Sequence, residues 1–67
     1  MKRWSYNEWK NGNIKVFTRS GKPVFPIGWY ANTFVGCVGD EMIAYDENTG
    51  KRFGQEETSD LDLFLGE

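Results

Sequence analysis

Residues 14–45 read IKVFTRSGKPVFPIGWYANTFVGCVGDEMIAY, and this stretch decides the fold. Its β-branched and aromatic residues come in short runs separated by turn-forming residues, which is the pattern of strands joined by tight turns. Because successive strands with short connections usually pair with each other, the pattern favours an antiparallel meander. The expected strands are residues 14–18, 24–30, 34–38 and 42–45, with a short additional strand at Lys51 to Phe53.

Glycine and proline refine this expectation. The turn at residues 19–22 contains Gly21, which can adopt positive φ, and Gly39 forms a tight turn with Asp40. Residues 31–33 are expected to form a loop and residues 46–50 a longer turn. Pro26 has no N–H to donate to a neighbouring strand, so its strand is expected to lie at an edge or to contain a bulge there.

One helix is expected, near the start of the sequence. Ser5 and Glu8 have the S-x-x-E spacing of a capping box, in which each side chain bonds the other residue's backbone N–H. Trp4 and Trp9 stand at the two positions of a hydrophobic staple, and Gly12 is a natural helix stop. A helix of two turns is not stable alone, so its tryptophans must pack on the sheet.

The segment Asp60 to Leu65 has two readings. Leu61, Leu63 and Leu65 alternate with other residues, which suits a half-buried strand. A short helical turn capped by Ser59 or Asp60 is the alternative. The extended reading is favoured.

The sequence therefore predicts a mostly β fold, α+β by strict count, in a single domain over residues 1–67. It is expected to be a small curled antiparallel meander of about five strands with a short N-terminal helix. So small a core supplies only ~3–5 kcal/mol of net stability. The one cysteine, Cys37, cannot form an internal disulfide and is expected in the core. The other core candidates are Trp4, Trp9, Phe17, Phe25, Phe34 and Leu63.

Composition argues against catalysis. The chain has no histidine, the most common general base, and Cys37 lies in an apolar run without the electropositive surroundings of a reactive thiol. Residues 46–50 lack the alternating ligands of a calcium loop. We expect no enzyme activity, no catalytic residue, no metal and no cofactor. Because no apolar run approaches a signal sequence or a membrane span, a cytoplasmic location without membrane contact is expected.

Charge is distributed unevenly along the chain. Residues 1–22 hold six basic and one acidic residue, whereas residues 23–67 hold two basic and nine acidic residues. Such asymmetry can indicate partners of opposite charge. The favoured alternative is that the two halves lie side by side and partly neutralise each other.

A candidate binding surface follows from aromatic and basic residues. The first half interleaves rings with cations, as single-stranded nucleic-acid platforms do, although the favoured reading is that the rings form the core and the cations keep the chain soluble. At the Trp29–Tyr30 pair, strand alternation sends one ring outward for a protein partner. The predicted surface residues are Lys15, Arg19, Lys22, Trp29 and Tyr30.

Residues 12–24, GNIKVFTRSGKPV, resemble the G-x-x-V-x-T-R-D-G-x-x-V pattern of small proteins common in bacteriophage and prophage genomes and in gut bacteria. The helix opening at Trp4, the strand at residues 34–38, the turn at residues 46–51 and the closing Asp60–Leu61 are similar in order. Ser20 replaces the usual aspartate, and Phe34 stands near the usual Tyr-Pro. The resemblance implies a mobile-element context and carries no catalytic or binding residue.

These observations predict a small non-enzymatic protein-interaction or accessory module of phage, prophage or mobile-element origin. Its partner is expected to be another protein, or a second copy joined through an open sheet edge, since open edges invite pairing. The alternative is a nucleic-acid-binding β domain that uses the basic N-terminal half.

Overall fold

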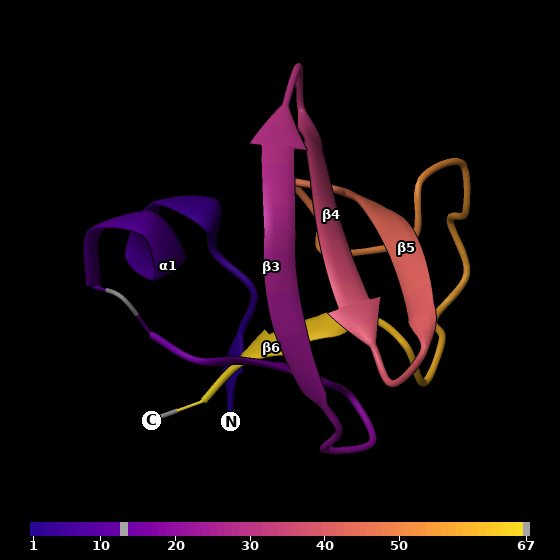
Figure 1. Cartoon of the computed structure of the whole chain (residues 1–67), viewed down its shortest axis with the longest axis horizontal. Coiled ribbons are helices and arrows are strands. Elements are labelled where there is room, and N and C mark those ends of the chain that lie inside the picture. Colours follow the sequence, from indigo (N-terminus) through magenta and orange to yellow (C-terminus); the bar gives the residue numbers. More distant parts are fainter. Residues whose placement is uncertain (13, 67) are drawn as a thin grey trace.

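The computed structural model describes residues 1–12 and 14–66. Within this part of the chain the fold is an antiparallel sheet with one short helix, as predicted (Figure 1). The elements in chain order are β1 (Lys2–Arg3), α1 (Tyr6–Gly12), β2 (Val16–Thr18), β3 (Pro23–Tyr30), β4 (Thr33–Val38), β5 (Glu41–Asp46) and β6 (Leu63–Leu65).

The sheet has the strand order β1-β6-β2-β3-β4-β5. Strands β2 to β5 form the predicted meander, but β6 returns from the end of the chain and inserts between β1 and β2, where Leu65 is opposite both Lys2 and Val16. The described residues thus give six strands instead of about five. The strand predicted at Lys51 to Phe53 is wrong, because this segment forms only an isolated bridge between Tyr45 and Arg52.

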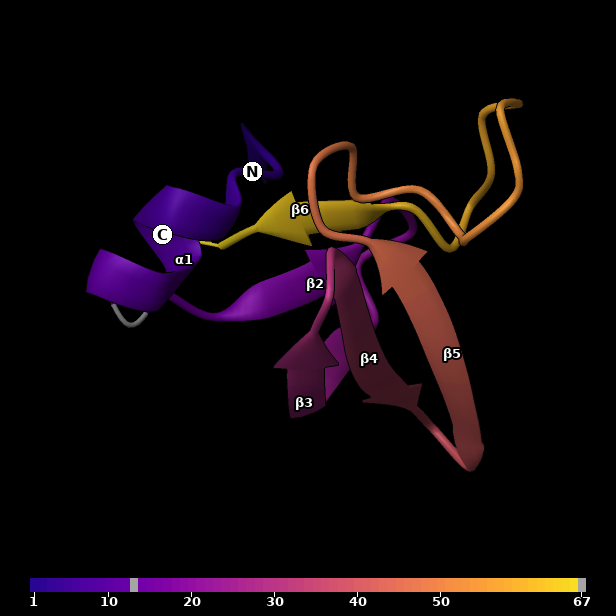
Figure 2. The ribbon, with the colours of Figure 1, turned by 90° about the horizontal axis from the view of Figure 1, so that it is seen from above.

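The sheet is strongly curled and open. Seen from above, β2 and β6 lie behind β3, β4 and β5 and run across them, while α1 closes one side (Figure 2). Strands β1 and β5 are the two outer strands of the sheet order and do not pair with each other among the described residues. The curl gives the sheet an inner face, which holds the core, and an outer face, which turns toward the reader in Figure 1.

The core lies between the inner face and α1. Trp4, Trp9, Phe34 and Leu63 are buried, as predicted, and the core also contains other residues of the sheet. Phe17 is only half-buried. The assignment of Phe25 to the core is wrong, since its side chain is 62% exposed. The additional buried hydrophobic residues are Val16, Val24, Val38, Ile43, Tyr45 and Leu65.

Pairing geometry explains why two of the predicted core residues lie elsewhere. On β4 the even-numbered residues Phe34 and Val38 point inward, so the odd-numbered Cys37 points outward. Phe25 is paired with Cys37 and shares its face. The expected burial of Cys37 in the core is therefore wrong as well: the residue is half-buried on the outer face.

Helix α1 begins largely as the sequence predicts. The Ser5 Oγ accepts a hydrogen bond from the Glu8 backbone N–H at 3.3 Å. The Glu8 carboxylate does not complete the capping box, because it pairs with the Lys2 Nζ at 2.8 Å. The Trp4 and Trp9 rings, 6.1 Å apart, form the predicted staple and carry the helix onto the core.

The turns follow the predicted positions. Gly21 and Gly39 have φ of 93° and 60°. The turn between β3 and β4 uses no glycine, because Ala31 and Asn32 adopt φ of 50° and 68° themselves. Pro26 precedes a register shift between β3 and β4, which confirms the predicted bulge.

Residues 46–50 form a turn that joins distant parts of the chain. The Trp4 Nε1–H donates to the Glu47 carbonyl at 2.7 Å, and the Leu63 N–H donates to the Gly50 carbonyl at 2.8 Å. Gly50 has a φ of 76°, and a Cβ at this position would lie 2.7 Å from the Cβ of Trp4. The turn therefore fastens the segment before α1 and the segment entering β6 to the end of β5.

The C-terminal segment combines the two predicted conformations. Leu63–Leu65 is extended as β6, which confirms the favoured reading for these residues. Just before it, the chain turns around Ser59, whose carbonyl accepts from the Asp62 N–H at 3.2 Å and whose Oγ accepts from the Leu61 N–H at 3.1 Å. Ser59 thus caps a local turn, as in the alternative reading.

Candidate functional site

The outer face of β3, β4 and β5 is apolar across its width. Strand register places side chains that point away from the core in rows. One row is Phe25–Cys37–Met42. The next is Gly28–Val35–Ala44, and Phe53 extends it because its N–H donates to the Ala44 carbonyl at 2.9 Å.

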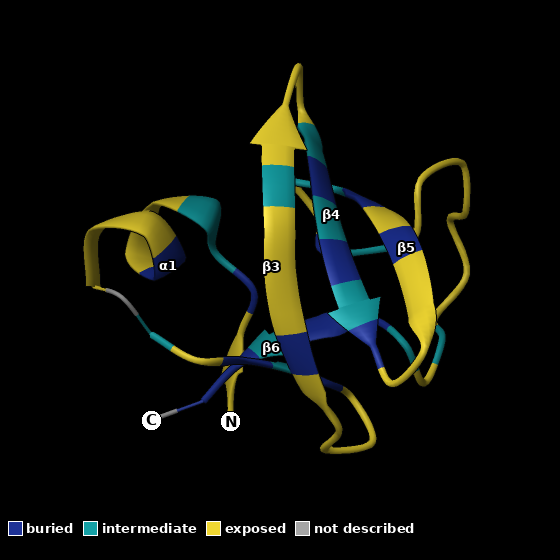
Figure 3. Ribbon diagram, viewed as in Figure 1, coloured by how far each residue is buried: buried dark blue, intermediate teal, exposed yellow. Residues whose placement is uncertain are grey.

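The outer face is uncovered in the described structure. Figure 3 shows β3 exposed over nearly its whole length, whereas β4 alternates between buried and half-buried residues. The exposed fractions are large for apolar side chains: 62% for Phe25, 57% for Ile27, 85% for Tyr30, 72% for Met42 and 57% for Phe53. We use the name outer face for Phe25, Ile27, Tyr30, Val35, Cys37, Met42, Ala44 and Phe53.

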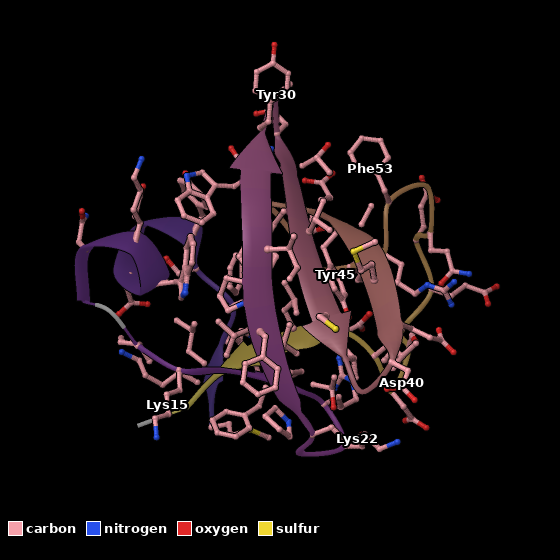
Figure 4. All side chains as sticks on the ribbon, in the orientation of Figure 1. Lys15, Lys22, Tyr30, Asp40, Tyr45 and Phe53 are labelled. Atoms are coloured by element: carbon pink, nitrogen blue, oxygen red, sulfur yellow. The ribbon has the colours of Figure 1, made fainter. Side chains whose placement is uncertain are left out.

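Charged side chains lie at one end of the outer face. The β2–β3 turn and the β4–β5 turn come to the same end of the sheet, opposite the β3–β4 turn (Figure 1). Lys15 and Lys22 lie at this end, and Asp40 lies there beside β5 (Figure 4). Glu41, the exposed first residue of β5, adds a second carboxylate next to Asp40.

The structure does not bring the five predicted surface residues together. Lys15 and Lys22 are exposed at the lower end in Figure 4, whereas Tyr30 points outward from the upper tip. Trp29 and Tyr30 lie on opposite faces, as strand alternation predicts. Trp29 packs edge-on against Trp9, with ring centroids 5.0 Å apart, and is 46% exposed.

Arg19 is held by neighbours of its own chain. Its Nη2 pairs with the Asp62 Oδ2 at 3.3 Å, and its Nε donates to the Ser59 carbonyl at 3.2 Å. The guanidinium also lies 4.7 Å from the centre of the Phe64 ring. Arg19 therefore ties the turn after β2 to the segment entering β6, and much of its binding capacity is used internally.

A second candidate site is a cationic cleft that the sequence analysis missed. Arg3, Arg19 and Lys51 line a cavity of about 450 Å³ between the start of the chain and the segment after β5. Asp62 is the one carboxylate among its lining residues. The lining thus carries net positive charge in a chain whose formal net charge is −2. Its other residues are Trp4, Asn48, Thr49, Thr58, Leu63 and Phe64.

Two buried polar atoms lack hydrogen-bond partners among the described residues, the Tyr45 hydroxyl and the Asp62 Oδ1. Tyr45 is fully buried, and this burial raises its pKa to about 12. Arg52 lowers this pKa and Asp62 raises it, each by a smaller amount than burial. The phenol is therefore kept neutral up to strongly alkaline pH.

Alkaline pH is expected to destabilise the protein through Tyr45. The unfolded state releases the phenol proton near pH 10, whereas the folded state holds it to about pH 12, so the folded state binds more protons between these values. Stability is full below pH 10 and falls by on the order of 2 kcal/mol as pH rises to 12. Urea unfolding at pH 9 and pH 11.5 measures this loss.

Two phenylalanine variants isolate the Tyr45 contribution. Tyr45→Phe should remove the loss and, because it deletes an unpartnered buried hydroxyl, should not lower stability at pH 7. Tyr30→Phe should keep the loss, since Tyr30 is 85% exposed. An equal alkaline loss in the Tyr45→Phe variant would contradict the assignment.

The sequence offered weak signals for both surfaces. Met42 and Ala44 alternate with the buried Ile43 and Tyr45, but all four are apolar, so hydropathy does not separate the two faces of β5. Arg3 and Lys51 are far apart in sequence, and long-range contacts bring their segments together: the insertion of β6 and the hydrogen bond from Trp4 to the Glu47 carbonyl.

The described residues contain neither a group of metal ligands nor a membrane-spanning helix. Among residues 1–12 and 14–66 no three His, Cys, Asp or Glu side chains are grouped so that they could hold a metal ion. Helix α1 is too short and too polar to cross a membrane, and the described chain offers no other candidate. No protein-family model, curated protein or solved structure is significantly similar to this chain.

Proposed function

We propose that this protein is a small non-enzymatic interaction module that binds a protein partner through the outer face. The single observation that carries the proposal is the apolar exposure of Phe25 and Ile27 on β3, Met42 on β5 and Phe53 just after β5. Large contiguous apolar patches are rare on monomeric proteins and mark interaction sites. The resemblance to small phage and prophage proteins supports an accessory role in a mobile element, in the cytoplasm of its host.

The exposed apolar side chains of the outer face would contribute more to the free energy of binding a partner than they contribute to the stability of the monomer. Each outer-face side chain points away from the core, so it contributes little to the stability of the monomer. Burying such a side chain in an interface contributes roughly 1.5–3 kcal/mol, the value for fully burying a large apolar group. Aromatic residues and methionine are enriched in protein interfaces for this reason.

Affinity capture from a host lysate with matched variants tests the proposal. Met42→Glu places a charge on the β5 side of the outer face and is expected to abolish capture of the partner. Asn7→Glu introduces the same charge on the exposed side of α1, away from the outer face, and should capture as the wild type does.

Capture by the wild type, Asn7→Glu and Met42→Glu shows whether the partner binds the outer face. A partner retained by the wild type and by Asn7→Glu, but lost with Met42→Glu, supports the proposal. Equal capture by all three proteins would show that the outer face is not the binding surface. Far-UV circular dichroism confirms that each variant is folded.

A second candidate function is nucleic-acid binding at the cationic cleft. The observation that favours it is the convergence of Arg3, Arg19 and Lys51 on one cavity, with the Phe64 ring in its lining. Phosphate contacts of this kind weaken steeply with salt. Anisotropy of labelled single-stranded DNA at 20 and 200 mM salt tests it, and Arg3→Ala should weaken any binding several-fold. Lys15 and Lys22, the exposed cations of the sequence prediction, are the next positions to vary.

A further inference from the structure

The cationic cleft has the charge and the hydrogen-bond donors of a site for a single phosphate group. We infer that it binds a small phosphorylated molecule, whose phosphate is held by Arg3, Arg19 and Lys51. This inference goes beyond the proposed function, because no residue of the outer face lines the cleft. It also assigns the cleft a ligand other than the nucleic acid of the second candidate function.

The cleft is built from segments that are distant in sequence. Arg3 belongs to β1, Arg19 follows β2, and Lys51 follows the turn after β5. The hydrogen bond from the Trp4 Nε1–H to the Glu47 carbonyl, 2.7 Å long, fastens the start of the chain to that turn. Figure 2 shows the same turn next to β6. The fold itself therefore fixes the backbone positions from which the three cations extend.

Each of the three cations keeps N–H donors that the described chain does not use. The contacts of Arg19 within the chain engage its Nη2 and Nε, which leaves Nη1 for a ligand. The Lys51 Nζ donates one N–H to the Glu56 carbonyl at 2.7 Å and has others to give. The Arg3 guanidinium makes no hydrogen bond or ion pair among the described residues. Because a guanidinium matches a pair of phosphate oxygens in shape and charge, Arg3 is the group best suited to an incoming phosphate.

The net charge of the lining is equal and opposite to that of a phosphate monoester. Three cations against one carboxylate leave a net charge of +2, whereas a phosphate monoester carries about −1.5 to −2 at pH 7. The carboxylate, Asp62, is only 4% exposed and binds Arg19 at 3.3 Å, so it orients that guanidinium and barely faces the cavity. Uncharged donors complete the lining: Asn48, Thr49 and Thr58.

Acidic residues beside the cleft favour a small ligand over a nucleic-acid strand. Glu47 and Glu57 are the sequence neighbours of the lining residues Asn48 and Thr58. A strand carries a phosphate every few ångströms, so the phosphates that flank the cleft would lie within the ~10 Å screening length of these carboxylates. A small molecule places its one phosphate among the cations and has none outside them. The cavity of about 450 Å³ is also within the range of roughly 300–1,000 Å³ that small-molecule pockets occupy.

Titration of the ¹⁵N-labelled protein with inorganic phosphate at constant ionic strength, followed by two-dimensional NMR, tests the inference. The amide signals of Thr49, Lys51 and Thr58 are expected to shift, with a dissociation constant on the order of 1 mM. Arg3→Ala should raise this constant about 10-fold, because it removes a charged donor. Lys15→Ala is the matched control: it removes an exposed cation that does not line the cleft, and should change the constant less than about 2-fold. The spectra also show whether each variant is folded.

Adenosine 5′-monophosphate and single-stranded DNA without terminal phosphates are the comparison ligands. Shifts that stay within the cleft and weaken in Arg3→Ala support the inference. Tighter binding of the nucleotide then indicates that the cavity also holds the rest of a phosphorylated molecule, whereas equal binding indicates that the phosphate alone is recognised.

Three results would overturn the inference. These are the absence of shifts up to about 20 mM phosphate, equal weakening by Arg3→Ala and Lys15→Ala, and binding of the DNA in the cleft at micromolar concentration. The last result would establish the second candidate function instead. None of them bears on capture through the outer face, because Met42 lies outside the cleft.

Discussion

Replacing Trp9 with alanine is expected to unfold the domain. Trp9 is buried at the centre of the aromatic cluster, with ring centroids 5.0 Å from both Phe34 and Trp29 and 6.1 Å from Trp4. Truncating a buried tryptophan costs about 3–5 kcal/mol. The net stability of so small a core is of the same size, ~3–5 kcal/mol. Urea unfolding followed by far-UV circular dichroism should find little or no folded protein in the Trp9→Ala variant.

Trp29→Ala is the matched control for this prediction. It removes the same side chain from the rim of the cluster, where Trp29 contacts Trp9 edge-on and is already 46% exposed. The expected loss is roughly 1–2 kcal/mol, because less apolar surface leaves water when Trp29 packs. Equal destabilisation by the two variants would show that the cluster is not centred on Trp9.

Gly50→Ala is expected to be nearly as damaging, although it adds a single methyl group. At the Gly50 φ of 76°, a non-glycine residue costs about 1–2 kcal/mol. The added Cβ would also lie 2.7 Å from the Cβ and 2.8 Å from the Cγ of Trp4, so the Trp4 side chain must move where it joins the backbone. Overpacking of this kind costs a further 1–3 kcal/mol, roughly. The midpoint of urea unfolding measures the sum.

Gly54→Ala separates the two contributions. Gly54 has a similar φ of 84°, but nothing lies within 4 Å of the Cβ that alanine would add. Its variant should therefore lose only the backbone part, about 1–2 kcal/mol. If Gly50→Ala and Gly54→Ala destabilise equally, the contact between Gly50 and Trp4 contributes nothing to the requirement for glycine.

Local signals in the sequence were sufficient for the turns, the helix and the meander. Ser5, Trp4 and Trp9 predicted the start of α1, because capping and staple contacts join residues that are close in sequence. Gly21 and Pro26 predicted a turn and a bulge for the same reason, since each restricts its own backbone.

Long-range pairing was not predictable from the same signals. The pairing of Lys2 with Leu65 joins opposite ends of the sequence, and no local pattern encodes it. Phe25 was assigned to the core because β3 is apolar on both faces, so alternation could not show which face is covered. The candidate site follows from these two facts, because it consists of the face that the curl leaves outside.

The place of β6 has a consequence for the order in which the chain can fold. This strand follows all the other elements along the sequence, yet it lies between β1 and β2 and pairs with both. It also contributes the buried Leu63 and Leu65 to the core. Until β6 pairs with both of them, β1 is not connected to β2 by any strand pairing. Strands β2 to β5 can then form only part of the sheet. Closing a contact between distant segments carries an entropic cost before any burial compensates it, which slows folding. During synthesis, β1 and β2 therefore remain unjoined until Leu63–Leu65 has emerged.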